Sequence, residues 1–370
     1  MRLLHTADWH LGKTLNRKNL LDDQKFILDE IFKVVDDEKP DAILIAGDIY
    51  DRADPSTEAV NLFDEIIFKL TEKKVPVLCI AGNHDSQDRL NFGSRVFANK
   101  KFFITAKTNS EPENIILQDK FGEIYFSLIP YFDPAEIKSK FLSEDDERLT
   151  FDAANKFYLD LARKKIPQGK RSVAIAHVFA EGGEESDSER KFVGTTGKVR
   201  AENFFGYDYV ALGHLHKPQK IISDNIRYSG SILKYSAKES SHKKGITLVE
   251  LDKNGFVRAE NILLTPRRDL IEVSGTLADF LAQPPNDAYA YITLTDEEFV
   301  YDASQKLRGV FPHFMDISNK SRPKNFIEEP TRKFRENVTL FEQFSDFFTE
   351  MTHRDLTDDE REALKEIFGG

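Results

Sequence analysis

The chain has 370 residues, 40% hydrophobic and 31% charged, a composition that predicts a soluble globular protein with more than one core. No apolar run reaches the length of a membrane span, so no membrane association is expected. One cysteine, Cys79, excludes an internal disulfide framework, and the N-terminus lacks a signal-peptide pattern, which together predict a cytoplasmic protein. The net charge of −11 argues against a protein that coats nucleic acid through overall charge. It does not exclude a nuclease, because bound metal ions supply local positive charge.

Short apolar, β-branched runs alternate with segments of helical periodicity over roughly the first 265 residues. Helices are expected at 20–35 and 57–70, the second beginning near the Pro55-Ser56-Thr57 sequence. The later part is richer in strands. The pattern predicts an α/β fold in which a sandwich of mixed β-sheets is flanked by helices. The expected strands are 2–6, 42–46, 77–81, 124–128, 172–176, 209–212, 226–229 and 246–251.

The sequence TPRR at 265–268 marks a predicted boundary after a domain formed by 1–265. Residues 266–318 predict a small α/β unit, with strands at 289–294 and 314–317 and a helix at 303–310. Residues 319–336 are rich in Lys, Arg and Pro and predict a basic linker. Residues 337–370 predict a tail of two helices, with an aromatic face on the first and a TDDE capping box at 357–360 opening the second. The sequence leaves open whether this tail packs on the chain's own core or binds a partner protein.

Five predicted strands end in side chains that can bind metal ions. The carboxyl ends of strands line the crevice of an open α/β sheet, so residues just beyond them can converge. Carboxylate, amide and imidazole groups, with one carboxylate as a bridge, suit two divalent ions. Glycines 47, 82 and 213 allow the backbone to turn close to such a site. Each candidate residue alone is more simply explained as a turn, cap or core residue. Such explanations are improbable for all five strand ends at once. The candidate ligands are Asp8, His10, Asp48, Asn83, His177, His214 and His216.

The order DxH, GDxxD, GNHD, H, GHxH resembles the calcineurin-like metallophosphoesterases. Within that superfamily, the stretches LHTADWHLG, AGDIYD and AGNHDS are similar to the SbcD family of bacterial nuclease subunits. The TPRR junction and the unit at 266–318 resemble that family's capping domain, which recognises DNA. The resemblance covers nearly the whole chain, is strongest over 1–270 and is weakest over 330–370.

This resemblance implies a four-layer sandwich core, two divalent ions of which Mn²⁺ is the expected metal, and a complex with an SbcC-type ATPase. It also implies a homodimer within a heterotetramer that acts on DNA in repair and recombination. The implied activities are a 3′–5′ double-strand exonuclease and a single-strand endonuclease, through attack of a metal-bound hydroxide on the phosphodiester. Carried over by position, one ion is held by Asp8, His10, Asp48 and His216, and the other by Asp48, Asn83, His177 and His214.

The resemblance gives His84 the part of a non-ligand catalytic histidine that faces the scissile phosphate. Archaeal and eukaryotic relatives carry a further histidine three residues after the bridging aspartate, where this chain has Asp51. Whether Asp51 orients His84 or has another catalytic role stays open. The acidic segment 181–189 is expected to be a mobile loop. Residues placed to meet a DNA backbone are Lys13, Asn16, Arg17 and Arg89.

Two alternatives to a DNA nuclease remain. A phosphoesterase acting on a small nucleotide or another phosphodiester would use the same ligands, because substrate choice lies in loops and accessory domains. A scaffold with a vestigial site would function through its aromatic tail, but the complete ligand set argues against this second alternative.

Overall fold

The computed structural model describes residues 1–112, 114–143, 148–189 and 197–320, and scattered single residues between 341 and 364. The chain divides into two compact units, one of Met1–Asp296 with Val300–Lys320 and the other of Glu297–Phe299 with Ser321–Gly370. Among the described residues, no helix combines the length and apolar character needed to cross a membrane.

Two six-stranded sheets form the centre of the first unit, in the orders β16-β15-β1-β4-β5-β6 and β13-β14-β12-β9-β8-β7. In the first sheet the neighbouring strands β1, β4, β5 and β6 run parallel, and in the second sheet so do β8, β9, β12 and β14. Antiparallel strands lie toward the sheet margins. The first sheet contains β1 (Arg2–Thr6), β4 (Ala42–Ala46), β5 (Val77–Ile80), β6 (Phe102–Thr105), β15 (Gly245–Asp252) and β16 (Gly255–Leu263). The second contains β7 (Asn114–Asp119), β8 (Gly122–Ile129), β9 (Arg171–His177), β12 (Tyr209–Gly213), β13 (Gln219–Ile221) and β14 (Ser223–Tyr228).

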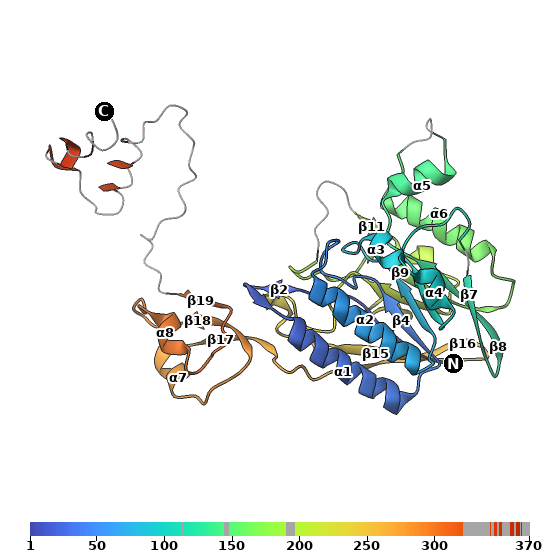
Figure 1. Ribbon diagram of the computed structural model, residues 1–370, viewed down its shortest axis with the longest axis horizontal. Helices are drawn as coiled ribbons and strands as arrows, with labels where there is room; N and C mark the ends of the chain where they lie inside the picture. Colours follow the sequence, from blue (N-terminus) through green and yellow to red (C-terminus); the bar gives the residue numbers. More distant parts are fainter. Residues whose placement is uncertain are drawn as a thin grey trace. The chain divides into compact units, whose positions relative to one another are not determined.

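Helices cover the outer face of each sheet, which gives four layers (Figure 1). Helices α1 (Leu21–Glu38) and α2 (Thr57–Glu72) lie side by side on the first sheet and are joined by an ion pair of 2.9 Å between Lys69 and Asp29. Helices α5 (Pro134–Phe141) and α6 (Phe151–Lys164) pack against the second sheet. Fully buried residues such as Leu44, Phe126 and Ile175 fill the space between the sheets. The predicted fold class is confirmed.

Each of the eight predicted strands is present, with ends that differ by up to three residues. The predicted start of α2 is also confirmed, because the Ser56 hydroxyl accepts a hydrogen bond of 3.3 Å from Ala59 N. The sequence analysis missed the four strands at the sheet margins, β6, β7, β13 and β16. The alternating, half-exposed residues of β7 and β16 give a weak apolar signal. The remaining short elements of this region are β2 (Thr14–Leu15), β3 (Lys18–Asn19), α3 (Gln87–Asn91), α4 (Ser94–Ala98), β10 (Phe179–Ala180), β11 (Lys198–Val199), η1 (Ala201–Phe204) and η2 (Ala237–Glu239).

The segment that resembles a capping domain folds as a three-stranded parallel sheet with two short helices. Its sheet has the order β17-β18-β19 and its core contains Phe280, Leu307 and Phe311. The strand β17 and the helix α7 were not predicted. The elements β18, α8 and β19 were predicted, and each begins at the predicted residue or within two residues of it. The bounds are β17 (Leu270–Gly275), α7 (Leu277–Leu281), β18 (Tyr289–Leu294), α8 (Ala303–Leu307) and β19 (Asp316–Asn319).

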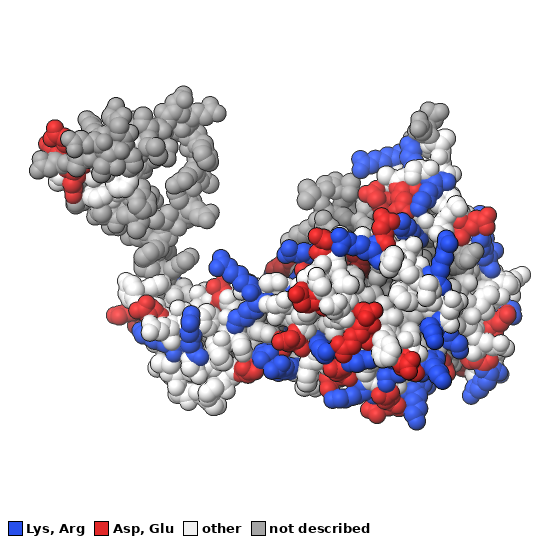
Figure 2. All heavy atoms as spheres, in the orientation of Figure 1, with Lys and Arg blue, Asp and Glu red and all other residues white. Residues whose placement is uncertain are grey.

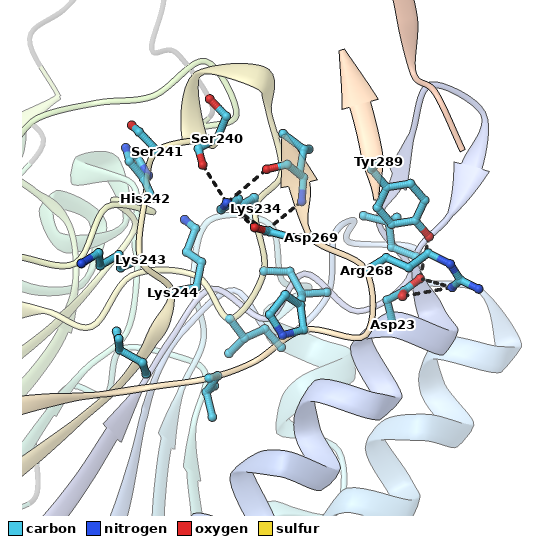
Figure 3. A pocket seen from close by; sticks show the side chains of 17 residues that line it. Asp23, Lys234, Ser240, Ser241, His242, Lys243, Lys244, Arg268, Asp269 and Tyr289 are labelled. Atoms are coloured by element: carbon cyan, nitrogen blue, oxygen red, sulfur yellow. Dashed lines mark hydrogen bonds and ion pairs between the residues drawn. The ribbon is translucent and has the colours of Figure 1, made fainter. Parts of the chain in front are cut away.

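A buried carboxylate anchors this segment to α1 (Figure 3). Asp23, which is 2% exposed, accepts hydrogen bonds from Arg268 at 3.2 Å and from the Tyr289 hydroxyl at 2.6 Å. Asn16 adds a second contact, donating to the carbonyl of Met315 at 2.9 Å. Charge-assisted hydrogen bonds that are shielded from water resist exchange with solvent, so they fix the junction firmly.

In the second unit, Thr357 and Glu360 form the predicted capping box. Thr357 N donates to the Glu360 carboxylate at 2.9 Å, and Glu360 N donates to the Thr357 hydroxyl at 3.4 Å. Most of the predicted linker at 319–336 and most of the two predicted tail helices at 337–370 lie outside the described residues.

Candidate metal centre

All seven candidate ligands come together at one end of the two sheets. Three of the five strand ends belong to β1, β4 and β5, which run parallel in the first sheet, and two belong to β9 and β12, which run parallel in the second. Parallel strands end at the same edge, so the residues beyond them meet there. Six of the seven side chains are buried, and only Asn83 is partly exposed.

Close contacts divide the seven residues into two overlapping groups. His10 Nε2 lies 3.0 Å from His216 Nε2 on one side. On the other side, Asn83 Oδ1 lies 3.0 Å from both His177 Nε2 and His214 Nδ1. Asp48 lies between them, with Oδ2 at 3.7 Å from His10 Nε2 and 3.4 Å from His177 Nε2. This position suits a carboxylate that bridges two ions.

The backbone around the site is held in conformations that non-glycine residues rarely adopt. Asp8, His10, Asp48 and His214 have φ values of 53°, 47°, 51° and 108°. Such strain persists only where the surrounding structure enforces it, and it concentrates at functional sites.

Close approach of the loops also explains the glycines that the sequence analysis singled out. A Cβ at Gly82 would lie 2.1 Å from the Asp48 carboxylate, and one at Gly213 would lie 1.9 Å from the carbonyl of Ala46. A Cβ at Gly47 would lie 2.4 Å from His177 Nδ1. Gly47 and Gly213 are therefore required for the two sheets to bring their strand ends this close, and Gly82 for the neighbouring ends of β4 and β5 within the first sheet.

The donor set fits divalent cations. His177 Nδ1 lies 2.8 Å from the carbonyl of Ala46, so Nδ1 carries the proton and Nε2 presents a lone pair. That lone pair faces Asn83 Oδ1 and the Asp48 carboxylate, and such acceptors repel one another unless a cation or proton lies between them. Within the part of the chain that the structure describes, the Asn83 amide nitrogen and His10 Nδ1 are buried without a hydrogen-bond partner, whereas the oxygen of Asn83 is turned toward the histidines. This arrangement suits coordination of a cation better than hydrogen bonding.

The pKa values of the buried groups also indicate that the carboxylates of the site need a positive charge beside them. Burial lowers the pKa of His177, but the Asp48 and Asp8 carboxylates and the carbonyl of Ala46 together outweigh that effect and raise the pKa to about 9. Burial raises the pKa of Asp8 to about 7 and lowers that of His214 to about 3. In the absence of a metal ion, a proton on His177 therefore compensates the carboxylates, a role that a bound cation would take over.

His84 is oriented by a backbone carbonyl. Its Nδ1 lies 2.7 Å from the carbonyl oxygen of Asp51, and its ring packs edge-on against His10. The Asp51 carboxylate points elsewhere, accepting from Lys13 Nζ at 2.8 Å and lying 3.8 Å from His10 Nδ1. The main-chain carbonyl of Asp51 therefore contacts His84, whereas its side chain faces the candidate ligand His10.

Two supporting residues escaped the sequence analysis. Asp85 accepts from the backbone N–H groups of Gly82, Ile49 and Tyr50 at 2.9, 3.1 and 2.9 Å, which ties the loops after β4 and β5 together. Gln24 of α1 donates to the carbonyl of His10 at 2.7 Å and thereby fixes the first loop. Asp85 stands in the GNHD motif, which was a usable signal, whereas nothing in the sequence marks Gln24.

The end of the acidic segment 181–189, for which a mobile loop was expected, packs behind His216. Ser188 Oγ lies 2.6 Å from His216 Nδ1, and Glu189 accepts from His216 N at 2.9 Å. The fully buried Glu239 lies 3.4 Å from the same Nδ1 and forms an ion pair with Lys244, which donates to the carbonyl of His216 at 2.7 Å. These polar partners hold the ring of His216 with Nε2 facing His10.

The four predicted DNA-contacting residues lie in different settings. Lys13 binds Asp51, Arg89 forms an ion pair of 2.6 Å with Asp54, and Asn16 binds Met315. Arg17 is exposed at the turn between β2 and β3 and has no hydrogen-bonding or ionic partner among the described residues. Positive and negative side chains intermingle on the face seen in Figure 2, so that face carries no broad basic surface.

Comparison with known proteins assigns the class first. A family model described as calcineurin-like phosphoesterase matches residues 1–218, and the chain belongs to this family. A model described as Type 5 capsule protein repressor C-terminal domain matches residues 266–352. More particularly, the chain is 34% identical over 375 residues to the SbcD subunit of nuclease SbcCD from Staphylococcus epidermidis, a match that spans 99% of this chain and 98% of that protein. A crystal structure of a dimetal phosphatase from Danio rerio overlaps 72% of this chain and 99% of its own, with a TM-score of 0.44 and 11% identity.

Proposed function

We propose that this protein is the metal-dependent nuclease subunit of an SbcCD-type complex and hydrolyses DNA phosphodiesters in repair and recombination. The observation that carries the proposal is the convergence of the seven candidate ligands in a chain similar over its full length to an SbcCD nuclease subunit. The proposed activities are 3′–5′ exonuclease action on double strands and endonuclease action on single strands.

Two divalent ions, proposed to be Mn²⁺, would be held by the two overlapping groups of residues. One ion would be held by Asp8, His10, Asp48 and His216, and the other by Asp48, Asn83, His177 and His214. Ligand atoms of Asp8, His10 and His216 lie within 4.8 Å of one another, as do those of Asp8, Asp48 and His177. Asn83 Oδ1 and His214 Nδ1 lie 3.0 Å apart. When bound, the ions supply Lewis-acid activation of a water molecule and neutralise charge on the phosphate.

His84 is proposed as the catalytic residue that assists departure of the leaving oxygen. Its Nδ1–H donates to the carbonyl of Asp51, so a protonated ring presents Nε2–H away from that contact. Asp51 is proposed as a positioning residue. Its carboxylate holds Lys13 beside the site and faces His10, and its carbonyl fixes the ring of His84.

The proposed partners are DNA, an SbcC-type ATPase and a second copy of this chain, all in the cytoplasm. The name of the Staphylococcus epidermidis relative supports the ATPase partner, since it denotes one subunit of a complex. The exposed Phe92 and Val96, with 84% and 68% of their surface accessible, support a protein contact at α3 and α4. The proposed divisions are a nuclease domain at 1–265, a capping domain at 266–318, a linker at 319–336 and a partner-binding tail at 337–370.

The test compares hydrolysis of duplex DNA with hydrolysis of bis(p-nitrophenyl) phosphate, using purified protein with Mn²⁺, with and without the ATPase. Cleavage of both substrates, and of DNA more strongly with the ATPase and ATP, is expected. Cleavage of the small diester alone, even with the ATPase present, would reject the nuclease assignment and favour a small-molecule phosphoesterase. A protein that binds no transition metal would reject both.

A further inference from the structure

A polar cavity of about 460 Å³ lies where β14 of one sheet approaches β16 of the other. Arg227 of β14, Asn261 of β16, the residues His242 and Lys243 of the loop before β15, and Lys217 line it. None of the seven candidate metal ligands is among its lining residues. The cavity is therefore separate from the metal centre, although Lys217 directly follows His216 in the chain.

The charged lining of this cavity has a single sign. It contains Lys217, Arg227 and Lys243 and, among the described residues, no Asp or Glu. This is unusual in a chain with 63 acidic and 52 basic residues. Lys217 is paired with Glu184, but Arg227 and Lys243 have no acceptor in the described part of the chain. Lys243 and its neighbour Lys244 also project in different directions (Figure 3), so only Lys244 joins the network behind His216.

Unsatisfied polar atoms concentrate in the same place. Arg227 Nε, His242 Nδ1 and Asn261 Oδ1 are buried without a hydrogen-bond partner, and they make up three of the nine such side-chain atoms found in the described residues. Two of the other six, on His10 and Asn83, lie in the metal centre. Buried polar groups are nearly always paired, so the two unpaired nitrogens that can donate, Arg227 Nε and His242 Nδ1, indicate a ligand that accepts hydrogen bonds.

We propose that this cavity binds a phosphate group. A guanidinium matches the oxygens of phosphate in shape and charge, Lys243 adds a second positive charge, and His242 Nδ1 can donate a neutral hydrogen bond. Resting on the proposed nuclease function, we assign the phosphate to the backbone of a DNA strand. A free nucleotide carries the same group, and the experiment distinguishes the two.

The test uses the full chain freed of metal with EDTA, so that the metal centre does not contribute phosphate binding. Inorganic phosphate, thymidine monophosphate and a fluorescent DNA duplex are titrated into the wild-type protein and the double variant Arg227→Gln/Lys243→Gln. We expect all three affinities to fall about tenfold or more in the double variant. The salt dependence of DNA binding is expected to weaken by about two units of log–log slope. Lys253→Gln, which removes an exposed charge between β15 and β16, is the matched control and should bind like wild type.

Loss of phosphate and nucleotide binding with unchanged DNA binding would assign the cavity to a free nucleotide and overturn the DNA assignment. Equal affinities of the double variant and the Lys253 control for all three probes would overturn the proposal. Lys243→Gln alone, at an exposed position, keeps the test available if the double variant does not fold. If wild-type protein with Mn²⁺ restored fails to cleave DNA but still binds phosphate, the nuclease assignment fails and the phosphate site stands.

Discussion

Replacing Glu239 with Gln tests whether the polar network behind His216 orients this candidate metal ligand. Glu239 is fully buried, lies 3.4 Å from His216 Nδ1 and forms an ion pair with the buried Lys244. Glutamine keeps the shape but removes the charge that favours a proton on Nδ1, and thus weakens the preference for a free Nε2. Outer partners of metal-bound histidines typically contribute about 10–100-fold to metal affinity. We expect Mn²⁺ affinity to fall within that range.

The same substitution also leaves Lys244 buried without its counter-ion. Breaking a buried pair costs about 3–5 kcal/mol, and the remaining hydrogen bonds from Lys244 to His216 and Ser231 favour the lower figure. At about 2–4 °C per kcal/mol, the melting temperature should fall by about 6–12 °C. The double variant Glu239→Gln/Lys244→Met removes the uncompensated charge, so part of the stability should return while the metal affinity stays low.

The assay is isothermal titration of metal-freed protein with Mn²⁺, paired with thermal unfolding of the same samples. Glu260→Gln, an exposed carboxylate on β16, serves as the control and should change neither quantity. Wild-type Mn²⁺ affinity in Glu239→Gln would refute the orienting role. Recovery of metal affinity together with stability in the double variant would show that the loss was structural.

Three further predictions follow from single contacts. His84→Gln should lower DNA hydrolysis by about 10²–10⁴-fold with bound Mn²⁺ near the wild-type amount, and loss of the metal would make His84 a ligand. Gly82→Ala should abolish Mn²⁺ binding in titration, because the new Cβ would lie 2.1 Å from Asp48, and normal binding would show that the loop can move. Hydrogen bonds from Arg171 hold the pKa of Asp119 below its usual value, so the ionised form stabilises the fold above about pH 4 and that gain is lost as the pH falls. Asp119→Asn should therefore lower the unfolding free energy by about 1.5–3 kcal/mol in urea at pH 7 and by less at pH 3.5, and an equal deficit at both would contradict the reasoning.

The order and identity of the candidate ligands were readable from the sequence because strand ends are local features. A buried parallel strand such as β4 is a continuous apolar run, and Gly47 and Asp48 stand directly after it. Parallel strands share an edge, so convergence of the five strand ends followed from the fold class without coordinates. The half-exposed strands β7 and β16 were missed because their residues alternate in burial.

The partners of those ligands were decided by the tertiary structure alone. Asp51 orients His84 through its carbonyl rather than its carboxylate, and no sequence pattern distinguishes the two. Ser188 and Glu239 reach His216 from segments 28 and 23 residues away, and Asp23 meets Tyr289 across 266 residues. Such contacts depend on how two sheets and their loops pack, which fixes distances to within an ångström. A sequence determines which chemical groups stand at the strand ends, whereas packing determines which groups hold them in place.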